Sequence, residues 1–106
     1  MINIMIVDDE TPSRRQFLSE LLNLGYDRKN ICEAQNSAAA LRLMQSFKPD
    51  ILISDISMPK MLGTDLAQKV TQLYPKCKII FFTGYSDKEY MKAAIKLNVV
   101  DYLEKP

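Results

Sequence analysis

Short apolar runs alternate along the chain with segments in which apolar residues recur every three or four positions. The runs have the length of β-strands and the spacing of the other segments is that of amphipathic helices. This alternation predicts an α/β domain built on a parallel sheet. The first run is apolar almost throughout, which is typical of a central strand covered on both faces, whereas the second has polar neighbours and fits an edge strand. The five predicted strands are Asn3–Val7, Asn30–Ala34, Ile51–Ser54, Lys78–Phe82 and Val100–Glu104.

The first two predicted helices have recognisable ends. Thr11 is the expected N-cap of the first helix, with Pro12 at the first helical position, and the helix should end near Gly25. Ser37 is the expected cap of the second helix, and residues 48–50 should end it because proline disfavours helix before it. Their apolar stripes are Phe17, Leu18, Leu21 and Leu22, and Ala40, Leu41, Met44 and Phe47.

Two further helices follow the third and fourth strands. Gly63 or Thr64 should open the third helix and Pro75 should close it. Ser86 or Asp87 should cap the fourth. Their apolar stripes are Leu66, Ala67, Val70 and Leu73, and Met91, Ala94, Ile95 and Leu97.

Length and charge narrow the class of protein. The 106 residues suit one domain, and 14 Lys and Arg nearly balance 13 Asp and Glu. We therefore expect no direct binding to nucleic acid or to an anionic membrane. Apolar runs stop far short of the roughly 20 residues that span a bilayer, and no signal peptide opens the sequence. A cytoplasmic protein is expected.

Cysteine and histidine usage excludes several chemistries. Cys32 and Cys77 lack CxxC spacing, and the chain contains no histidine. A zinc site and a serine-type triad are therefore not expected, and both thiols should be reduced packing groups. Any phosphohistidine must belong to a partner. The methionines should pack in the core or in loops and carry no cofactor signal; they include Met5, Met44, Met58, Met61 and Met91.

Polar residues follow four of the apolar runs directly. Asp8 and Asp9 follow the first strand, Asp55 the third, Thr83 the fourth and Lys105 the last. Right-handed parallel connections bring these strand ends to one edge of the sheet, where open α/β sheets bind their ligands. Each residue alone also fits an ordinary role: a helix-dipole acid, a turn residue or a surface ion pair. Their shared position is what favours a site.

The combination suits phosphoryl transfer assisted by a metal. Clustered carboxylates repel one another unless a cation lies among them, and oxygen donors suit Mg²⁺. The cation would keep Asp55 ionised as a nucleophile and neutralise oxygens of an incoming phosphoryl group. Lys105 and the Thr83 hydroxyl could supply the remaining contacts. The expected product is an aspartyl phosphate on Asp55.

Four motifs resemble the receiver domain of two-component response regulators, which is CheY-like. They are VDDE at 7–10, SDISMPKMLG at 54–63, FFTGY at 81–85 and DYLEKP at 101–106, and the match runs from end to end. The resemblance implies one receiver domain over residues 1–106. It also implies a flavodoxin-like fold, a five-stranded parallel sheet of order 2-1-3-4-5 with helices on both faces. The family's fifth helix, which would follow the Lys-Pro pair, is absent from the sequence. We therefore expect that a partner surface replaces it or that the chain is truncated.

The resemblance also assigns roles to the site residues. Asp9 would ligate Mg²⁺ directly, or Mn²⁺ in its place, and Asp8 would act through a bound water. Asp55 would ligate the metal and accept the phosphoryl group, and the backbone carbonyl of Ser57 would complete the protein's ligands. Thr83 would move toward the phosphoryl group. The remaining implied roles are an inward turn of Tyr102, contact of Lys105 with phosphoryl oxygens, and a cis Lys105-Pro106 bond.

The same resemblance implies a role for two residues near the site and a set of partners. Ser57 and Tyr85 would border the path of the hydrolytic water and so set the rate of self-dephosphorylation. The implied donor is a sensor histidine kinase or phosphotransfer protein, which would dock near Pro12 and Ser13. The family also implies an output domain outside this chain, of which a DNA-binding domain is one form. Residues 83–106 are similar to receivers joined to AraC-type DNA-binding domains. A homodimer is also compatible with the family.

Other functions stay open at this stage. A metal-dependent phosphohydrolase with an aspartyl nucleophile would carry a second acid at the place of Ser57. A flavodoxin would need a phosphate-binding loop after the first strand, where Asp8, Asp9 and Glu10 would repel the phosphate. A receiver-like module that binds partners without phosphorylation is disfavoured because all five site positions are filled. The leading prediction is a phosphorylation-controlled transcriptional switch that turns over no external substrate.

Overall fold

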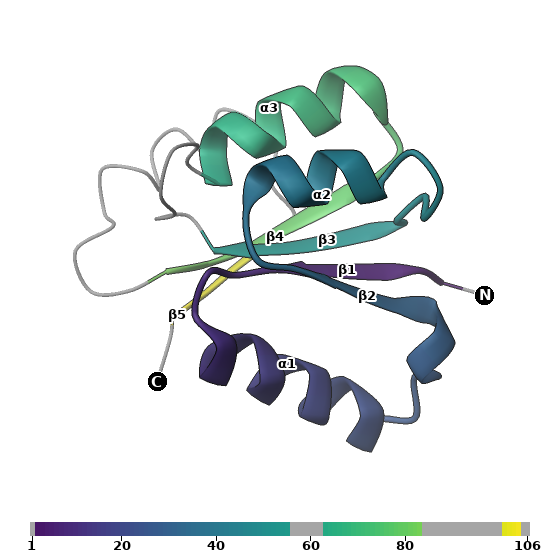
Figure 1. Ribbon diagram of the computed structural model, residues 1–106, viewed down its shortest axis with the longest axis vertical. Coiled ribbons are helices and arrows are strands. Elements are labelled where there is room, and N and C mark those ends of the chain that lie inside the picture. Colours follow the sequence, from purple (N-terminus) through teal and green to yellow (C-terminus); the bar gives the residue numbers. More distant parts are fainter. Residues whose placement is uncertain (1, 56–62, 84–100, 105–106) are drawn as a thin grey trace.

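A parallel sheet with helices on both faces forms the core of the protein (Figure 1). The computed structural model describes residues 2–55, 63–83 and 101–104. The strand order is β2-β1-β3-β4-β5, so the predicted flavodoxin-like fold is confirmed. The strands are β1 (Ile4–Val7), β2 (Ile31–Ala34), β3 (Ile51–Asp55), β4 (Lys78–Thr83) and β5 (Asp101–Glu104). The helices are α1 (Thr11–Asn23), α2 (Ser37–Leu43), α3 (Gly63–Leu73) and the short 3₁₀ helix η1 (Arg28–Asn30).

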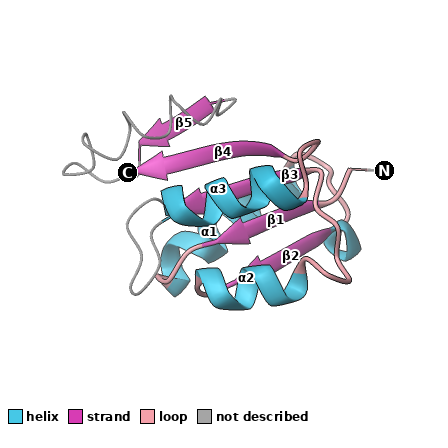
Figure 2. Ribbon diagram, turned by 90° about the horizontal axis from the view of Figure 1, so that it is seen from above, coloured by secondary structure: helices cyan, strands magenta, loops and turns pink. Residues whose placement is uncertain are grey.

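All five strands run in the same direction, so their carboxyl ends meet at one edge (Figure 2). Val7 at the end of β1 lies opposite Ala34 of β2 and Ser54 of β3. In β3, Asp55 lies opposite Phe82 of β4. This register sets the level at which each strand delivers the residue that follows it.

The two faces of the sheet carry separate apolar clusters. Successive side chains of a strand point to opposite faces, so β1 contributes to both clusters and is buried throughout, as its composition predicted. Helices α2 and α3 lie on one face and α1 on the other (Figure 1). The α2–α3 side contains Met5, Val7, Ala40, Met44, Leu52, Leu66, Val70 and Phe81. The α1 side contains Ile4, Ile6, Leu18, Ile31 and Ile53, with Phe17 and Leu21 packed against them.

Helix α1 begins one residue earlier than expected. Thr11 is the first helical residue and Glu10 is the N-cap, so the expected Thr11 cap is wrong and Pro12 is the second helical residue. The cause lies in the preceding turn, where the Glu10 N–H donates to Asp8 Oδ1 at 3.0 Å. The Glu10 carbonyl then accepts the first helical hydrogen bond from the Arg14 N–H at 3.0 Å.

The other end of α1 is close to the prediction. The helix ends at Asn23, and Gly25 has a φ of 99°, a left-handed conformation that glycine adopts without steric cost. Leu22 was expected in the apolar stripe, and that expectation is wrong because its side chain is exposed. The other predicted residues Leu18 and Leu21 do pack toward the sheet, so the apolar face of α1 is narrower than expected.

Helix α2 differs from the prediction at both ends. Its N-cap is Asn36, whose Oδ1 accepts the Ala39 N–H at 2.7 Å, so Ser37 is the first helical residue rather than the cap. Both residue types cap helices well, and the one-residue shift leaves Ser37 buried. The helix ends at Leu43 rather than near residues 48–50. In the turn that follows, the Leu43 carbonyl accepts hydrogen bonds from the Ser46 N–H at 3.2 Å and the Phe47 N–H at 2.8 Å.

Several predictions fall outside the described residues. They concern the fourth helix, the loop methionines and the peptide bond before Pro106; these residues are 56–62, 84–100 and 105–106. Within the described part, Met5 and Met44 are fully buried core residues, as predicted. A search of the described helices finds none that is long and apolar enough to cross a bilayer.

Met44 provides a direct test of the α2 packing. Its side chain is 0% exposed against the sheet, whereas the side chain of Leu24 is 75% exposed. We predict that Met44→Ala lowers the free energy of unfolding by about 2–5 kcal/mol because it leaves a cavity. Leu24→Ala should change it by less than about 0.5 kcal/mol. Chemical denaturation of both variants checks this; equal effects would contradict the assigned core.

Candidate functional site

Two buried aspartates meet at the carboxyl edge of the sheet. Asp8 follows β1 directly and Asp55 is the last residue of β3, the neighbouring strand. Because Val7 is in register with Ser54, Asp8 comes level with Asp55. Their side chains are 0% and 1% exposed. Fully buried aspartates are rare in proteins, so a buried pair at this edge indicates a functional site.

Two further carboxylates complete the cluster. Carboxylate oxygens of Asp8, Asp9, Glu10 and Asp55 all lie within 4.8 Å of one another, and those of Asp9 and Glu10 are on exposed residues. The three aspartates were predicted to come together. Glu10 was not predicted as part of the site, although its place directly after Asp9 in the VDDE motif was a usable signal.

The chemistry of this donor set fits a hard divalent cation. All four groups offer oxygen, which Mg²⁺ prefers. The upper limit of 4.8 Å on their separation is compatible with the roughly 4.2 Å between opposite ligands of an octahedral Mg²⁺ with bonds of about 2.1 Å. Histidine is absent from the chain, so nitrogen ligation from imidazole is not available to it. The cluster is therefore suited to Mg²⁺ or Mn²⁺ rather than to a softer metal.

Hydrogen bonds fix the backbone around both aspartates. The Asp8 N–H donates to the Ala34 carbonyl of β2 at 3.1 Å, which continues the sheet pairing past the end of β1. The Ser54 hydroxyl donates to the Asp55 carbonyl at 2.9 Å in a buried position. The site is thus supported by strands on both sides of β1.

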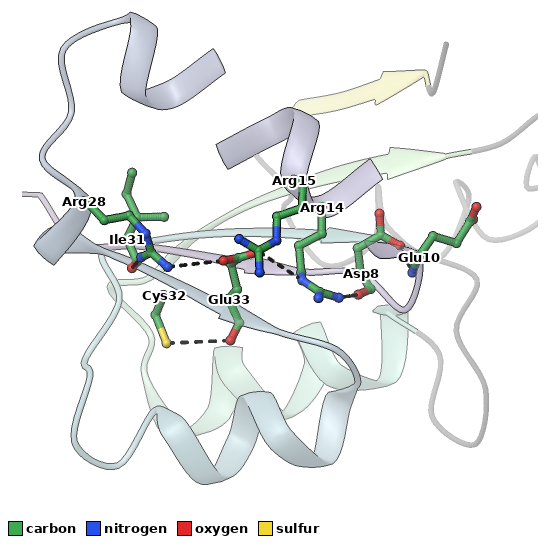
Figure 3. Close-up of polar contacts among 8 residues, drawn as sticks. All are labelled: Asp8, Glu10, Arg14, Arg15, Arg28, Ile31, Cys32 and Glu33. Atoms are coloured by element: carbon green, nitrogen blue, oxygen red, sulfur yellow. Dashed lines mark hydrogen bonds and ion pairs between the residues drawn. The ribbon is translucent and has the colours of Figure 1, made fainter. Parts of the chain in front are cut away.

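A group of arginines lies around Glu33 on the α1 side of the sheet, and Arg14 connects this group to Asp8 (Figure 3). Glu33 of β2 forms ion pairs with Arg14 at 3.1 Å, Arg15 at 3.6 Å and Arg28 at 3.3 Å. Arg14 also donates to the Asp8 carbonyl at 2.8 Å. None of these contacts was predicted, because each joins residues from different structural elements.

Only some of the other predicted site residues lie within the described part of the chain. Thr83 ends β4 one residue beyond the level of Asp55, and Tyr102 lies opposite Phe81 in β5. Both residues therefore belong to strands whose carboxyl ends lie at the same edge of the sheet as the acidic cluster. Ser57, Tyr85 and Lys105 lie outside the described residues.

The two cysteines are not members of the acidic cluster. Cys32 and Cys77 are free and half-buried, and both pack against the α2–α3 cluster, as their predicted packing role requires. Burial raises the pKa of the Cys77 thiol to about 11, and the nearby Asp50 carboxylate adds to this effect. Burial likewise raises the pKa of Cys32, against a smaller lowering by Arg28. Both thiols are therefore protonated and weakly reactive at neutral pH.

Comparison with known proteins identifies the family of the chain. The sequence model of the response regulator receiver domain matches residues 4–106. The chain belongs to the response regulator receiver family. The match includes the strands β1 and β3 that carry the acidic cluster, so the resemblance drawn from the four motifs is confirmed.

Similar receiver domains occur in named transcriptional regulators. The chain is 38% identical over 107 residues to the transcriptional regulatory protein HptR of Staphylococcus aureus strain NCTC 8325 / PS 47, and the match covers all of this chain. A solved structure of a two component transcriptional regulator AraC from Clostridium phytofermentans ISDg is 39% identical, with a TM-score of 0.87 over 100% of this chain and 82% of that one. The receiver domain of AraT, a response regulator from Geobacillus stearothermophilus, is 34% identical, with a TM-score of 0.81 over 99% and 81% of the two chains.

The extent of these matches differs between the two kinds of relative. The chain spans 41% of the length of HptR but more than four fifths of the solved receiver domains. The match to HptR therefore involves only part of that protein. The relatives are named as transcriptional regulators rather than as enzymes that turn over a substrate.

Proposed function

We propose that this receiver domain is a phosphoacceptor switch in which Asp55 receives a phosphoryl group from a sensor histidine kinase or phosphotransfer protein. The observation that carries the proposal is the buried Asp55 carboxylate, which lies within 4.8 Å of three other carboxylates at the carboxyl edge of the sheet. Small acyl phosphates are a second source of the phosphoryl group. The chain has no histidine, so the phosphohistidine donor is a residue of the partner.

The transfer is a displacement at phosphorus. A carboxylate oxygen of Asp55 attacks the phosphorus atom while the bond from phosphorus to the partner's imidazole nitrogen breaks. The electron pair of that bond returns to the imidazole, and Asp55 becomes an aspartyl phosphate. Burial of Asp55 keeps bulk water away from the reacting oxygen, which favours transfer over hydrolysis.

A divalent cation is the proposed cofactor. Asp8, Asp9, Asp55 and the backbone carbonyl of Ser57 would hold Mg²⁺, with Mn²⁺ as a substitute, and Glu10 adds a fourth nearby carboxylate. When bound, the cation offsets the repulsion between the carboxylates and the negative charge of the phosphoryl oxygens. The hydrogen bonds around Asp8 and Asp55 supply the fixed positions that such neutralisation needs.

The switch is proposed to run through the next two strands. Thr83 and Lys105 contact the phosphoryl group, and Tyr102 turns inward behind Thr83. The support is positional: Thr83 ends the strand that pairs with β3, and Tyr102 lies in the strand paired with β4. Phosphorylation at Asp55 would then be read out at the β4–β5 side of the domain.

The proposed role of the whole protein is control of transcription through an output domain. HptR and the Clostridium regulator are both named as transcriptional regulators, and the chain spans 41% of HptR. Residues 1–106 would form the receiver unit, with a near-neutral charge of +1 that gives it no electrostatic affinity for DNA of its own.

Phosphorylation by a small donor tests the chemistry directly. On incubation with acetyl phosphate and Mg²⁺, intact mass measurement should show a gain of one phosphoryl group. Asp55→Asn should abolish the gain because the nucleophile is gone, and EDTA should abolish it because the cation is removed. Asp50→Asn, at the opposite end of β3, should leave the gain intact. A gain that survives Asp55→Asn, or no gain in the parent, would overturn the proposal.

Tyr85 provides a test of the lifetime of the phosphorylated state. The bulk of its side chain is proposed to shield the acyl phosphate from water, together with Ser57. Tyr85→Ala should therefore speed dephosphorylation by a factor of a few, as followed by the loss of the phosphorylated mass over time. Tyr26→Ala, a change at an exposed tyrosine beyond α1, is the matched control and should leave the rate unchanged. Equal decay of Tyr85→Ala and the parent would refute the assignment.

A further inference from the structure

Arg14 joins three parts of the structure around the turn between β1 and α1 (Figure 3). Its Nη1 donates to the Asp8 carbonyl at 2.8 Å, and its Nε donates to Glu33 Oε1 at 3.1 Å. Its backbone N–H donates to the Glu10 carbonyl at 3.0 Å. The side chains of Arg14 and Glu33 are only 11% and 12% exposed. This buried fork therefore ties the edge strand β2 to the turn that carries the acidic cluster.

The hydrogen bond from Arg14 to the Asp8 carbonyl acts on the stretch of backbone that carries the acidic cluster. The N–H of Asp8 is held by the Ala34 carbonyl, and Asp8 Oδ1 accepts the Glu10 N–H. The carbonyl of Asp8 belongs to the peptide that leads to Asp9, so its orientation sets where the chain goes next. Arg14 fixes that orientation with a charge-assisted hydrogen bond, which is stronger than one between neutral groups.

We propose that Arg14, held in place by Glu33, is a positioning residue that fixes the Asp8 carbonyl and thereby orders the Asp8, Asp9 and Glu10 carboxylates for a divalent cation. The inference rests on the proposed function, because it deepens the metal site assigned there. Arg14 acts through the backbone and Glu33 acts through Arg14. Mutation of groups that orient metal ligands typically lowers metal affinity about 10–100-fold.

The charge of Arg14 and its proposed positioning role predict opposite changes in cation affinity when the residue is removed. A guanidinium beside the carboxylates repels a cation, so if charge alone mattered, its removal should tighten cation binding. If position matters, removal of Arg14 should weaken binding, because the turn loses its brace. Arg15 separates the two effects, since it carries the same charge at the next position but is 63% exposed and lies 3.6 Å from Glu33. The sign of the change in affinity therefore decides between the two explanations.

Titration with Mn²⁺ of the parent and of three variants tests the inference without any phosphorylation step. Arg14→Ala should raise the dissociation constant about 10–100-fold. Arg15→Ala should leave it unchanged or slightly lower. Arg14→Lys keeps the charge but cannot reproduce the two-armed contact, so its affinity should fall between those of the parent and Arg14→Ala. If Arg14→Ala does not fold, Arg14→Lys carries the test, and affinity equal to the parent would overturn the inference.

A packing variant distinguishes positioning from a general loss of stability. Leu18→Ala removes a buried side chain of α1 on the sheet side and leaves the Arg14 contacts in place. It should lower the denaturant midpoint while the Mn²⁺ affinity stays within twofold. An equal loss of affinity in Leu18→Ala and Arg14→Ala would overturn the positioning role. No Mn²⁺ binding by the parent would instead overturn the metal site of the proposed function, and the inference with it.

Discussion

The parallel register of β1 with β3 sets the level at which Asp8 and Asp55 leave the sheet. Both side chains are buried there, next to the carboxylates of Asp9 and Glu10. Two unit charges about 4 Å apart repel by about 4 kcal/mol at an effective dielectric constant of about 20. That is a large part of the 5–15 kcal/mol that typically stabilises a domain. A positive charge at the carboxyl edge would offset this repulsion.

The surrounding structure is organised to hold this edge in place. The core clusters on both faces of β1 keep the central strand fixed, so the turn that follows it starts from a rigid base. The Ala34 carbonyl of β2, the Glu10 N–H and the Arg14 side chain then bind the Asp8 backbone and carboxylate. On the other side of β3, β4 ends at Thr83 and pairs with β5, which links the acidic edge to the strand that contains Tyr102. The packing of the sheet thus fixes the candidate site residues at the ends of adjacent strands.

Periodicity and composition predicted most of the fold. Each of the five predicted strands is present to within one residue at either end, because buried parallel strands are near-continuous apolar runs. The order of the strands and the sharing of helices between the faces came from the family resemblance and from the handedness of parallel connections. The three aspartates could be predicted because they are each next to a strand end.

Other features depend on contacts that sequence patterns do not encode. Asn36 and Ser37 are both good caps by residue type, so the sequence alone does not distinguish Asn36, which caps the helix in the structure, from Ser37. Leu22 fits the helical spacing but lies beyond the width of the face that α1 buries. The pairing of Arg14 with Glu33 joins positions 19 residues apart and follows from how α1 crosses the sheet.

The most direct test is the dependence of unfolding on Mg²⁺ in the parent and in Asp9→Asn, which removes one exposed carboxylate of the cluster. The free energy of unfolding of the parent should rise with Mg²⁺ by about 1.4 kcal/mol per tenfold increase above the dissociation constant. In EDTA, Asp9→Asn should be at least as stable as the parent because one repulsion is gone, and Mg²⁺ should stabilise it less. Glu20→Gln, an exposed change on α1, should behave like the parent. If Mg²⁺ stabilises Asp9→Asn as much as the parent, or stabilises neither, the acidic edge is not a cation site.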